Sequence, residues 1–170
     1  MDDESLTNVI NKIGISKDDI RIEAIGSVDE ASAALGFARA SSNLDQNKQN
    51  IYKIQQHLHL LMAQLALQGP DLQIENGSFR DKLNWIEDQI IVYSGLVKVP
   101  DHFIFPGQGI AEGALALART VIRRAERRVV ALKNNTPDFD PLLINYLNRL
   151  SYFIFMMELL ELSDKSSCGL

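Results

Sequence analysis

The stretch IAEGALALARTVIRRAERRVVALKN, residues 110–134, decides the predicted fold. Its apolar residues recur every three or four positions and, at about 100° per residue, project onto one narrow stripe. The stripe consists of Leu115, Ala118, Ile122, Ala125 and Val129. Such a stripe is typical of an amphipathic helix that packs on a core. We therefore expect a helix over residues 110–134.

Arginines are concentrated on the same segment. Arg119, Arg123 and Glu126 fall on the border of the apolar stripe. Arg124 and Arg128 project away from it and are by default solvent-facing charges. Arginines four residues apart repel each other by a few tenths of a kcal/mol, and desolvation at a half-buried border adds to that cost. Two explanations stay open here: ion pairs within the chain, or guanidinium groups that hold a polyphosphate or another subunit's carboxylate.

Four further segments show helical periodicity, with Gly, Pro and Asn residues punctuating the chain between them. They span about 28–41, 46–67, 78–94 and 141–162. The first is predicted from a capping box formed by Ser27 and Glu30. Strand alternation with hairpin turns is nowhere convincing. We predict one all-α domain over residues 1–170, a bundle of five helices with an irregular segment at 1–20 and a polar tail at 163–170.

Composition excludes several classes of protein. With 170 residues, 46% hydrophobic and 23% charged, the chain can bury a core without disulfides or metal. Cys168 is the only cysteine, and His57 and His59 diverge on a helix, so no metal site is expected. The net charge of -5 disfavours general binding to nucleic acid or membranes. With no membrane-length apolar run and an acidic N-terminus unlike a targeting peptide, we expect a cytoplasmic protein.

The last helical segment is apolar around more than the usual third of its circumference. We expect it to be central in the bundle or to contact another subunit, and oligomerisation is the economical explanation. Asn148 lies on its narrow polar side. A buried Asn is usually satisfied by a neighbouring helix, so Asn148 alone does not indicate a function.

Four blocks resemble, in order and spacing, motifs of the PduO-type ATP:cob(I)alamin adenosyltransferases, also called corrinoid adenosyltransferases. They are RIEAIGSVDE (21–30) beside RVEAYGTVDEL, FIFPG (103–107) beside FILPGG, ARTVIRRAERRVV (118–130) beside ARTVCRRAERRVV, and YLNRLS (146–151) beside YLNRLSD. The resemblance covers about residues 7–155, and the arginine block is its most specific part. The chain is therefore identified as a member of that family.

The resemblance implies a five-helix bundle of the cobalamin adenosyltransferase type, assembled as a homotrimer, with ATP and the corrinoid in clefts between subunits. In such enzymes Co(I) attacks the 5′ carbon of ATP, adenosine passes to cobalt and triphosphate leaves. That reaction depends mainly on positioning and on stabilising the departing negative charge. The resemblance implies Mg²⁺-ATP as co-substrate and cobalamin as substrate. It also implies a cobalamin reductase and an adenosylcobalamin-dependent mutase as partners.

The resemblance further implies roles for individual residues. The ATP-binding contacts it implies are Arg123, Arg124, Glu126, Arg127 and Asn148. Lys17 matches the family lysine that reaches the phosphates. Asp29 and Arg119 match an ion pair between subunits and, with Arg123, are the expected catalytic residues. Phe103 matches the aromatic that closes over the lower face of the corrinoid, excluding the axial ligand.

Several of these residues have a structural alternative. Asp29, in the first turn of a predicted helix, gains stability from the helix dipole whatever its partner. Lys17 is otherwise an exposed lysine. Phe103, between Pro100 and Pro106, would otherwise anchor a loop in the core.

The N-terminus departs from the family pattern. Family members open with TGDxGxT, a loop whose backbone amides approach the phosphates. In the matching first seven residues Asp3 and Thr7 fit, but Asp2 and Ser5 replace both glycines, and Tyr152 replaces an aspartate after NRLS. Acidic residues suit an anion-binding loop only where they hold the metal ion. Two hypotheses follow: an active adenosyltransferase, or a catalytically impaired member that binds nucleotide or corrinoid as a carrier or regulatory subunit.

Overall fold

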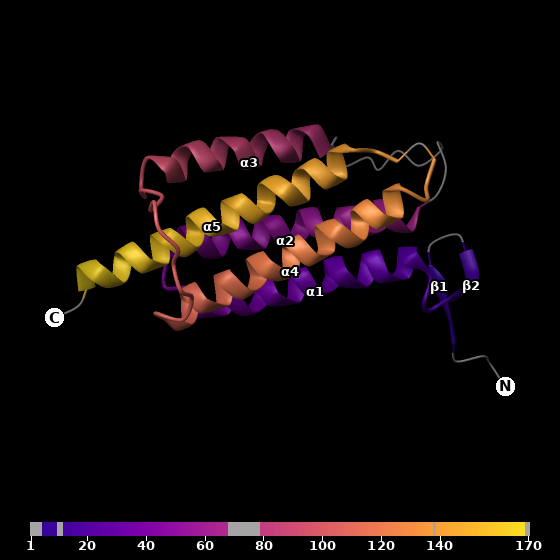
Figure 1. The fold of residues 1–170 in the computed structure, drawn as a ribbon, viewed down its shortest axis with the longest axis horizontal. Coiled ribbons are helices and arrows are strands. Elements are labelled where there is room, and N and C mark those ends of the chain that lie inside the picture. Colours follow the sequence, from indigo (N-terminus) through magenta and orange to yellow (C-terminus); the bar gives the residue numbers. More distant parts are fainter. Residues whose placement is uncertain (1–4, 10–11, 68–78, 138, 169–170) are drawn as a thin grey trace.

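The structure of the protein is a computed structural model that describes residues 5–9, 12–67, 79–137 and 139–168. Within these ranges a short hairpin precedes five helices (Figure 1). The elements are β1 (Leu6–Val9), β2 (Lys12–Ser16), α1 (Ile20–Ser41), α2 (Asp45–Ala66), α3 (Phe79–Ser94), α4 (Ile110–Lys133) and α5 (Leu142–Cys168). The predicted five-helix bundle is confirmed for the described part of the chain.

Helix α4 joins the two halves of the bundle. It packs against α1 on one side and α5 on the other, while α2 packs on α1 and α3 packs on α5. The apolar stripe predicted from the sequence is buried without any exposed surface: Leu115, Ala118, Ile122, Ala125 and Val129. Because burying a large apolar side chain contributes roughly 1.5–3 kcal/mol, this stripe fixes the position of α4.

Helix α5 is buried around most of its circumference within the single subunit. Its fully buried residues are Tyr146, Leu147, Leu150, Phe153, Ile154, Met156 and Met157. Of the two explanations for its wide apolar surface, a central position in the bundle accounts for it without a second subunit. Within the described ranges, no helix combines the length and the apolar content that a membrane crossing requires.

The start of α1 differs from the prediction. The helix begins at Ile20 rather than near residue 28, because Asp19 caps it by accepting a hydrogen bond from the Arg21 amide at 2.7 Å. The predicted cap residue Ser27 lies inside the helix, where its hydroxyl donates to the Glu23 carbonyl at 2.8 Å. Buried Ala24 stabilises these early turns by packing on the core. The other predicted helices begin within one residue of their observed starts, but α5 continues through 163–168.

The prediction of an irregular segment at 1–20 is wrong for its described part. Strands β1 and β2 pair antiparallel, with Thr7 opposite Ile15. Gly14 has a left-handed backbone (φ 71°), and its amide donates to the Asn8 side chain at 3.1 Å. At four and five residues, these strands are too short for alternation to be recognised in the sequence.

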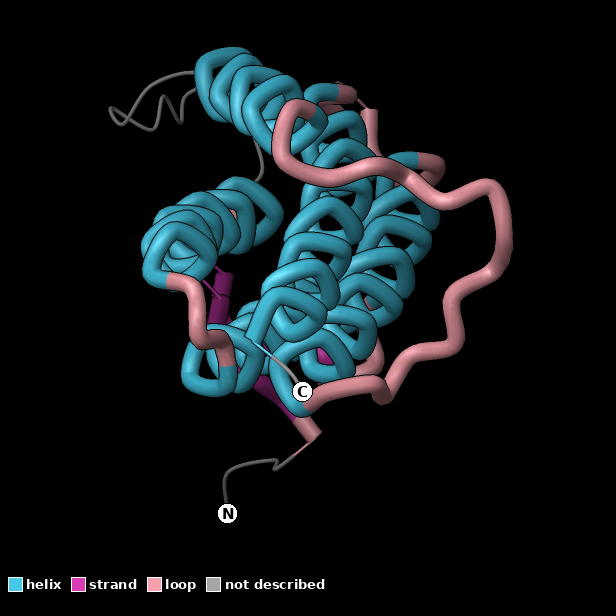
Figure 2. Tube along the Cα trace, turned by 90° about the vertical axis from the view of Figure 1, so that its left-hand side faces the viewer, coloured by secondary structure: helices cyan, strands magenta, loops and turns pink. Residues whose placement is uncertain are grey.

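The connection between α3 and α4, residues 95–109, is a long loop without helix or strand. Figure 2 shows it standing away from the helices in a wide arc. Val97 and Ile104 pack against the core. The two phenylalanines of this loop, Phe103 and Phe105, are 76% and 77% exposed. Phe103 therefore does not anchor the loop, so the alternative expectation of a purely structural role for this residue is wrong.

His57 is a titratable group whose pKa the fold changes strongly. It lies buried on α2, with Nδ1 3.0 Å from the Tyr146 hydroxyl of α5 and its ring edge-on to Trp85 of α3. Burial, and then the positive charges of Lys82 and Lys53, lower the pKa of His57 to about 4.

Acidification should therefore destabilise the fold through His57. Its pKa is 6.5 in the unfolded chain and about 4 in the folded one, so the folded state binds fewer protons between these values. Above pH 6.5 the titration of His57 does not lower the free energy of unfolding. As the pH falls from 6.5 toward 4, it lowers that free energy by up to roughly 3 kcal/mol. Denaturant unfolding at a series of pH values measures the slope of the free energy of unfolding against pH.

His57→Gln should remove most of this slope, even if the variant is less stable throughout. His59→Gln controls for the loss of a histidine as such, because His59 is exposed on the same helix. An unchanged slope in His57→Gln would show that other groups cause the acid sensitivity.

Candidate functional site

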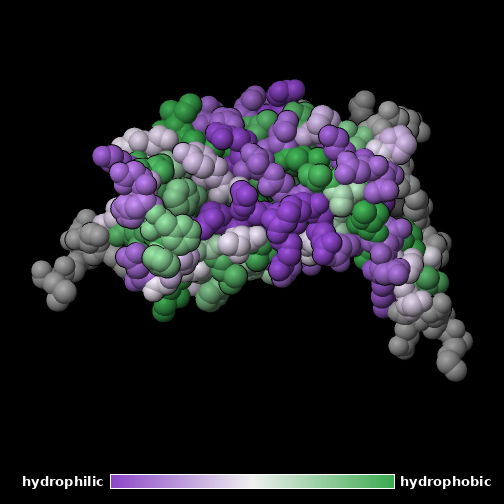
Figure 3. Space-filling view, in the orientation of Figure 1, coloured by the Kyte–Doolittle hydropathy of each residue, from purple (hydrophilic) through white to green (hydrophobic). Residues whose placement is uncertain are grey.

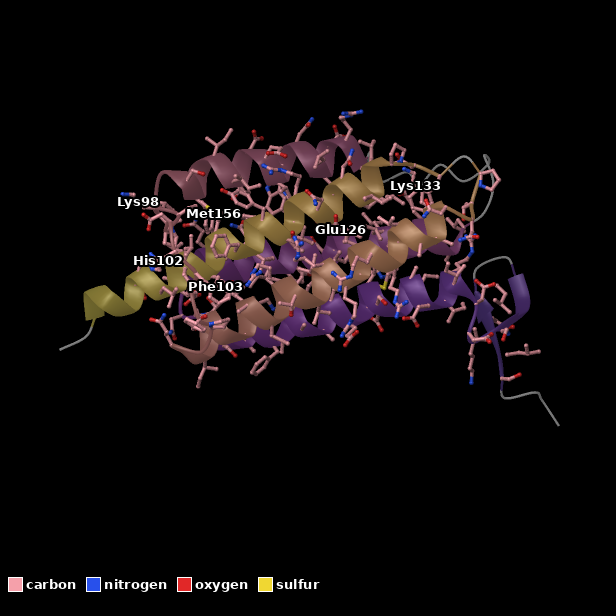
Figure 4. The ribbon with its side chains drawn as sticks, in the orientation of Figure 1. Lys98, His102, Phe103, Glu126, Lys133 and Met156 are labelled. Carbon is pink, nitrogen blue, oxygen red and sulfur yellow. The ribbon has the colours of Figure 1, made fainter. Side chains whose placement is uncertain are left out.

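A cleft of about 480 Å³ lies between α4, α5 and the 95–109 loop. Its lining residues are His102, Phe103, Ile104, Arg119, Arg123, Asn148, Arg149, Ser151, Tyr152, Phe155 and Glu158. Figure 3 shows hydrophilic side chains gathered in a band along the middle of this face. Figure 4 shows Phe103 and His102 beside α5, and Glu126 further along α4. The cleft brings together four residues predicted from the sequence: Phe103, Arg119, Arg123 and Asn148.

Arg119 has a partner within its own subunit. Its Nε donates to the Glu158 carboxylate at 3.1 Å, and its guanidinium lies 5.6 Å from the Phe155 ring centre. The Glu158 side chain is 1% exposed and that of Arg119 is 27% exposed. Burial raises the pKa of Glu158, the Arg119 charge counteracts that rise, and Glu112 adds to it. Arg119 therefore forms an ion pair within the described chain, which accounts for one of its hydrogen-bond donors.

Arg123 differs from Arg119 because it forms no hydrogen bond or ion pair with any residue in the described ranges. Beside it, the Asn148 amide donates to the Glu126 carboxylate at 2.9 Å, which links α5 to α4. The Asn148 amide is thus held in one orientation at the cleft. An unpaired guanidinium next to an oriented amide suits a ligand with anionic and hydrogen-bonding groups.

The remaining arginines of the block face α1 instead. Arg124 pairs with Glu30, and the Arg128 Nε lies 3.0 Å from a Glu23 carboxylate oxygen. Arg124 and Arg127 line a separate hollow between α1 and α4. The predicted ATP-binding block is therefore divided in one subunit between two faces of α4.

Three other predicted residues lie outside the cleft. Thr7 and Asp29 line a hollow of about 590 Å³ formed by the hairpin, α1 and α2. Lys17 is exposed after β2, and its backbone amide donates to the Ser5 carbonyl at 2.9 Å. The hairpin lies at the opposite end of the bundle from Phe103 (Figures 1 and 4). Asp3 lies outside the described residues.

Sequence reasoning missed several residues of the cleft wall. Arg149 binds the Glu87 carboxylate through two hydrogen bonds, at 2.5 and 2.7 Å, and lies over the Tyr152 ring at 5.3 Å. Phe155 and Glu158 complete the wall. One feature of the sequence could have located this wall. Glu158 is an acidic residue within an apolar helical run, and a buried charge needs a partner. Within the described ranges, no group of three His, Cys, Asp or Glu side chains is placed to hold a metal ion.

A family model described as cobalamin adenosyltransferase matches residues 1–161. A corrinoid adenosyltransferase of Citrobacter freundii is 32% identical over 171 residues, covering 98% of this chain and 95% of that protein. One from Bacillus subtilis is 31% identical over 144 residues, covering 82% and 72%. A variant PduO-type ATP:corrinoid adenosyltransferase from Lactobacillus reuteri, solved with cobalamin and ATP, is 28% identical with a TM-score of 0.84, covering 92% and 88%.

The Arg119–Glu158 pair should stabilise the subunit more than the exposed Arg124–Glu30 pair. Glu158→Gln should lower the free energy of unfolding by about 1–2 kcal/mol, because a charge-assisted hydrogen bond is lost at a buried position. The cost of burying the carboxylate offsets part of that loss. Glu30→Gln, the matched control that breaks an exposed ion pair of the same helix α4 with α1, should cost much less. Equal losses in chemical denaturation at one pH would contradict this assignment.

Proposed function

Because the chain belongs to the cobalamin adenosyltransferase family, we propose that it transfers the 5′-deoxyadenosyl group of ATP to cob(I)alamin, giving adenosylcobalamin and triphosphate. One observation carries the proposal: the cleft places the unpaired Arg123 and the oriented Asn148 amide in one pocket with the exposed Phe103. These groups suit a polyphosphate nucleotide beside a flat apolar macrocycle. The similar proteins, which are corrinoid adenosyltransferases, do not favour the alternative of a binding-only carrier or regulatory subunit.

The reaction needs positioning and charge stabilisation rather than proton transfer. The electron pair of Co(I) forms the bond to the 5′ carbon, and the electrons of the breaking carbon–oxygen bond leave with triphosphate. Arg123 is available to stabilise the leaving triphosphate, because it forms no ion pair with a described carboxylate. Mg²⁺ would enter with ATP, because this ion binds substrate phosphates with only one or two protein carboxylates.

The two halves of the predicted site support an assembly of several subunits. Lys17, Thr7 and Asp29 lie away from the cleft that holds Arg119 and Arg123 in the same chain. In a homotrimer, the hairpin and α1 of one subunit would complete the cleft of its neighbour, with Asp29 reaching Arg119. A ring of repeated head-to-tail contacts generates three equivalent sites.

Exposed apolar side chains on α1 and α4 support such an interface. Phe37, Ile110 and Leu117 are large hydrophobic residues left exposed in the single subunit. They lie on the two helices that also line the hollow containing Arg124 and Arg127. A neighbouring subunit packed there would cover the apolar residues and use these arginines.

The proposed chemistry also indicates partners and location. A corrinoid reductase must supply Co(I), and an adenosylcobalamin-dependent mutase would consume the product. Phe103 would assist the first of these by covering the lower face of the corrinoid. We place the reaction in the cytoplasm, where ATP is available.

Arg123→Ala should reduce turnover at least about 100-fold while leaving the oligomer intact, because one preorganised positive group on the leaving triphosphate is lost. The assay follows the absorbance of adenosylcobalamin after anaerobic mixing with chemically reduced cob(I)alamin and Mg²⁺-ATP. Arg128→Ala is the matched control, since Arg128 is on the same helix but pairs with Glu23. Unchanged turnover in Arg123→Ala would remove this residue from the mechanism.

Hybrid oligomers test whether the site lies between subunits. Lys17→Ala and Arg123→Ala subunits, each inactive alone, are co-expressed with different tags and purified through both. Because purification through both tags removes the homotrimers, about one third of the interfaces in the remaining hybrids should combine an intact Lys17 with an intact Arg123, and activity should return to that extent. A site contained in one chain would leave the hybrids inactive.

A further inference from the structure

Glu112 is a completely buried carboxylate in the first turn of α4. It forms no ion pair with any residue in the described part of the chain. Burying an unpaired carboxylate costs several kcal/mol unless hydrogen bonds compensate for the lost water. The partners of Glu112 are therefore informative about what this residue does.

Those partners are three consecutive backbone amides at the end of the 95–109 loop. The Gly107 amide donates to the Glu112 carboxylate at 2.9 Å, the Gln108 amide at 2.8 Å and the Gly109 amide at 3.3 Å. Gly107 adopts a left-handed backbone, with φ of 106°, which lets successive amides converge on one anion. Gly109 is the N-cap of α4 and has no side chain, so Glu112 supplies the cap from within the helix.

The clamped segment directly follows the aromatic rim of the cleft. Phe103 and Phe105 contact each other edge to face at 5.2 Å and are otherwise largely exposed. The two phenylalanines themselves therefore do little to fix the loop, whose wide arc is seen in Figure 2, and between them only Ile104 packs against the core. The Glu112 carboxylate also acts electrostatically on Glu158 in the cleft wall. Glu112 is thus connected to the cleft in two ways, through the loop amides that it binds and through its charge, which acts on Glu158.

We propose that Glu112 is a positioning residue that clamps the loop at Gly107–Gly109 and so holds Phe103 and Phe105 in place to receive the corrinoid. The inference rests on the proposed function, because it takes the corrinoid to be the ligand of this rim. A preorganised rim avoids the cost of ordering the loop when the ligand binds.

The first readout needs no ligand. All three loop amides donate to the same oxygen, Oε2 of Glu112, so Glu112→Gln keeps one acceptor there but removes the negative charge and turns the other oxygen into an amide that cannot accept, which weakens the hydrogen bonds. Hydrogen exchange at residues 107–109 should become about tenfold faster or more, while the core amides of α2 keep their protection. Glu112→Asp keeps the charge and should restore part of the protection. Unchanged exchange in Glu112→Gln would overturn the clamp.

The second readout is corrinoid affinity, measured by spectroscopic titration of the full-length protein with cob(II)alamin. Glu112→Gln should raise the Kd for cob(II)alamin about tenfold, while the Kd for ATP should change by less than about twofold. In a Phe103→Ala background the same substitution should have little further effect, because Glu112 acts through the rim. Faster exchange with an unchanged corrinoid Kd would overturn the positioning role. An unmodified protein that binds no corrinoid would overturn the proposed function as well, which distinguishes the two failures.

Discussion

The packing of one amphipathic helix determines the arrangement of the others. Helix α4 buries its apolar stripe against α1 and α5, and α2 and α3 pack on the outer sides of those helices. The stripe is narrow and made of small or branched residues such as Ala118, Ala125 and Ile122, which lets the neighbouring helices approach closely. Because arginines flank this stripe, the packing that builds the core also aims their charges at α1 and α5.

The position of an arginine around α4 determines which ion-pair partner it reaches. Arg119 reaches a buried carboxylate, Arg124 and Arg128 reach exposed carboxylates of α1, and Arg123 reaches no described partner. Paired guanidinium groups chiefly serve the subunit, whereas an unpaired one at a cleft is available to a ligand. The same block of sequence thus supplies structural ion pairs and, within the described residues, an unpaired guanidinium at the cleft.

The sequence predicted the helices well because their apolar periodicity is long and regular. It misplaced the start of α1, because Ser27 and Glu30 satisfy a capping pattern that the stronger cap at Asp19 overrides. In the cleft, resemblance to a family located Arg119, Arg123, Asn148 and Phe103. It did not locate Glu158 or Glu112, because their partners lie on another helix or on loop amides that no local pattern reveals.

In the proposed reaction this chain makes a bond between cobalt and the 5′ carbon of ATP. Anaerobic incubation of the unmodified protein with chemically reduced cob(I)alamin and Mg²⁺-ATP is the direct test of this reaction. The expected result is the absorbance spectrum of adenosylcobalamin together with an equal amount of intact triphosphate. Persistence of cob(I)alamin, with no triphosphate released by a folded protein, would contradict it.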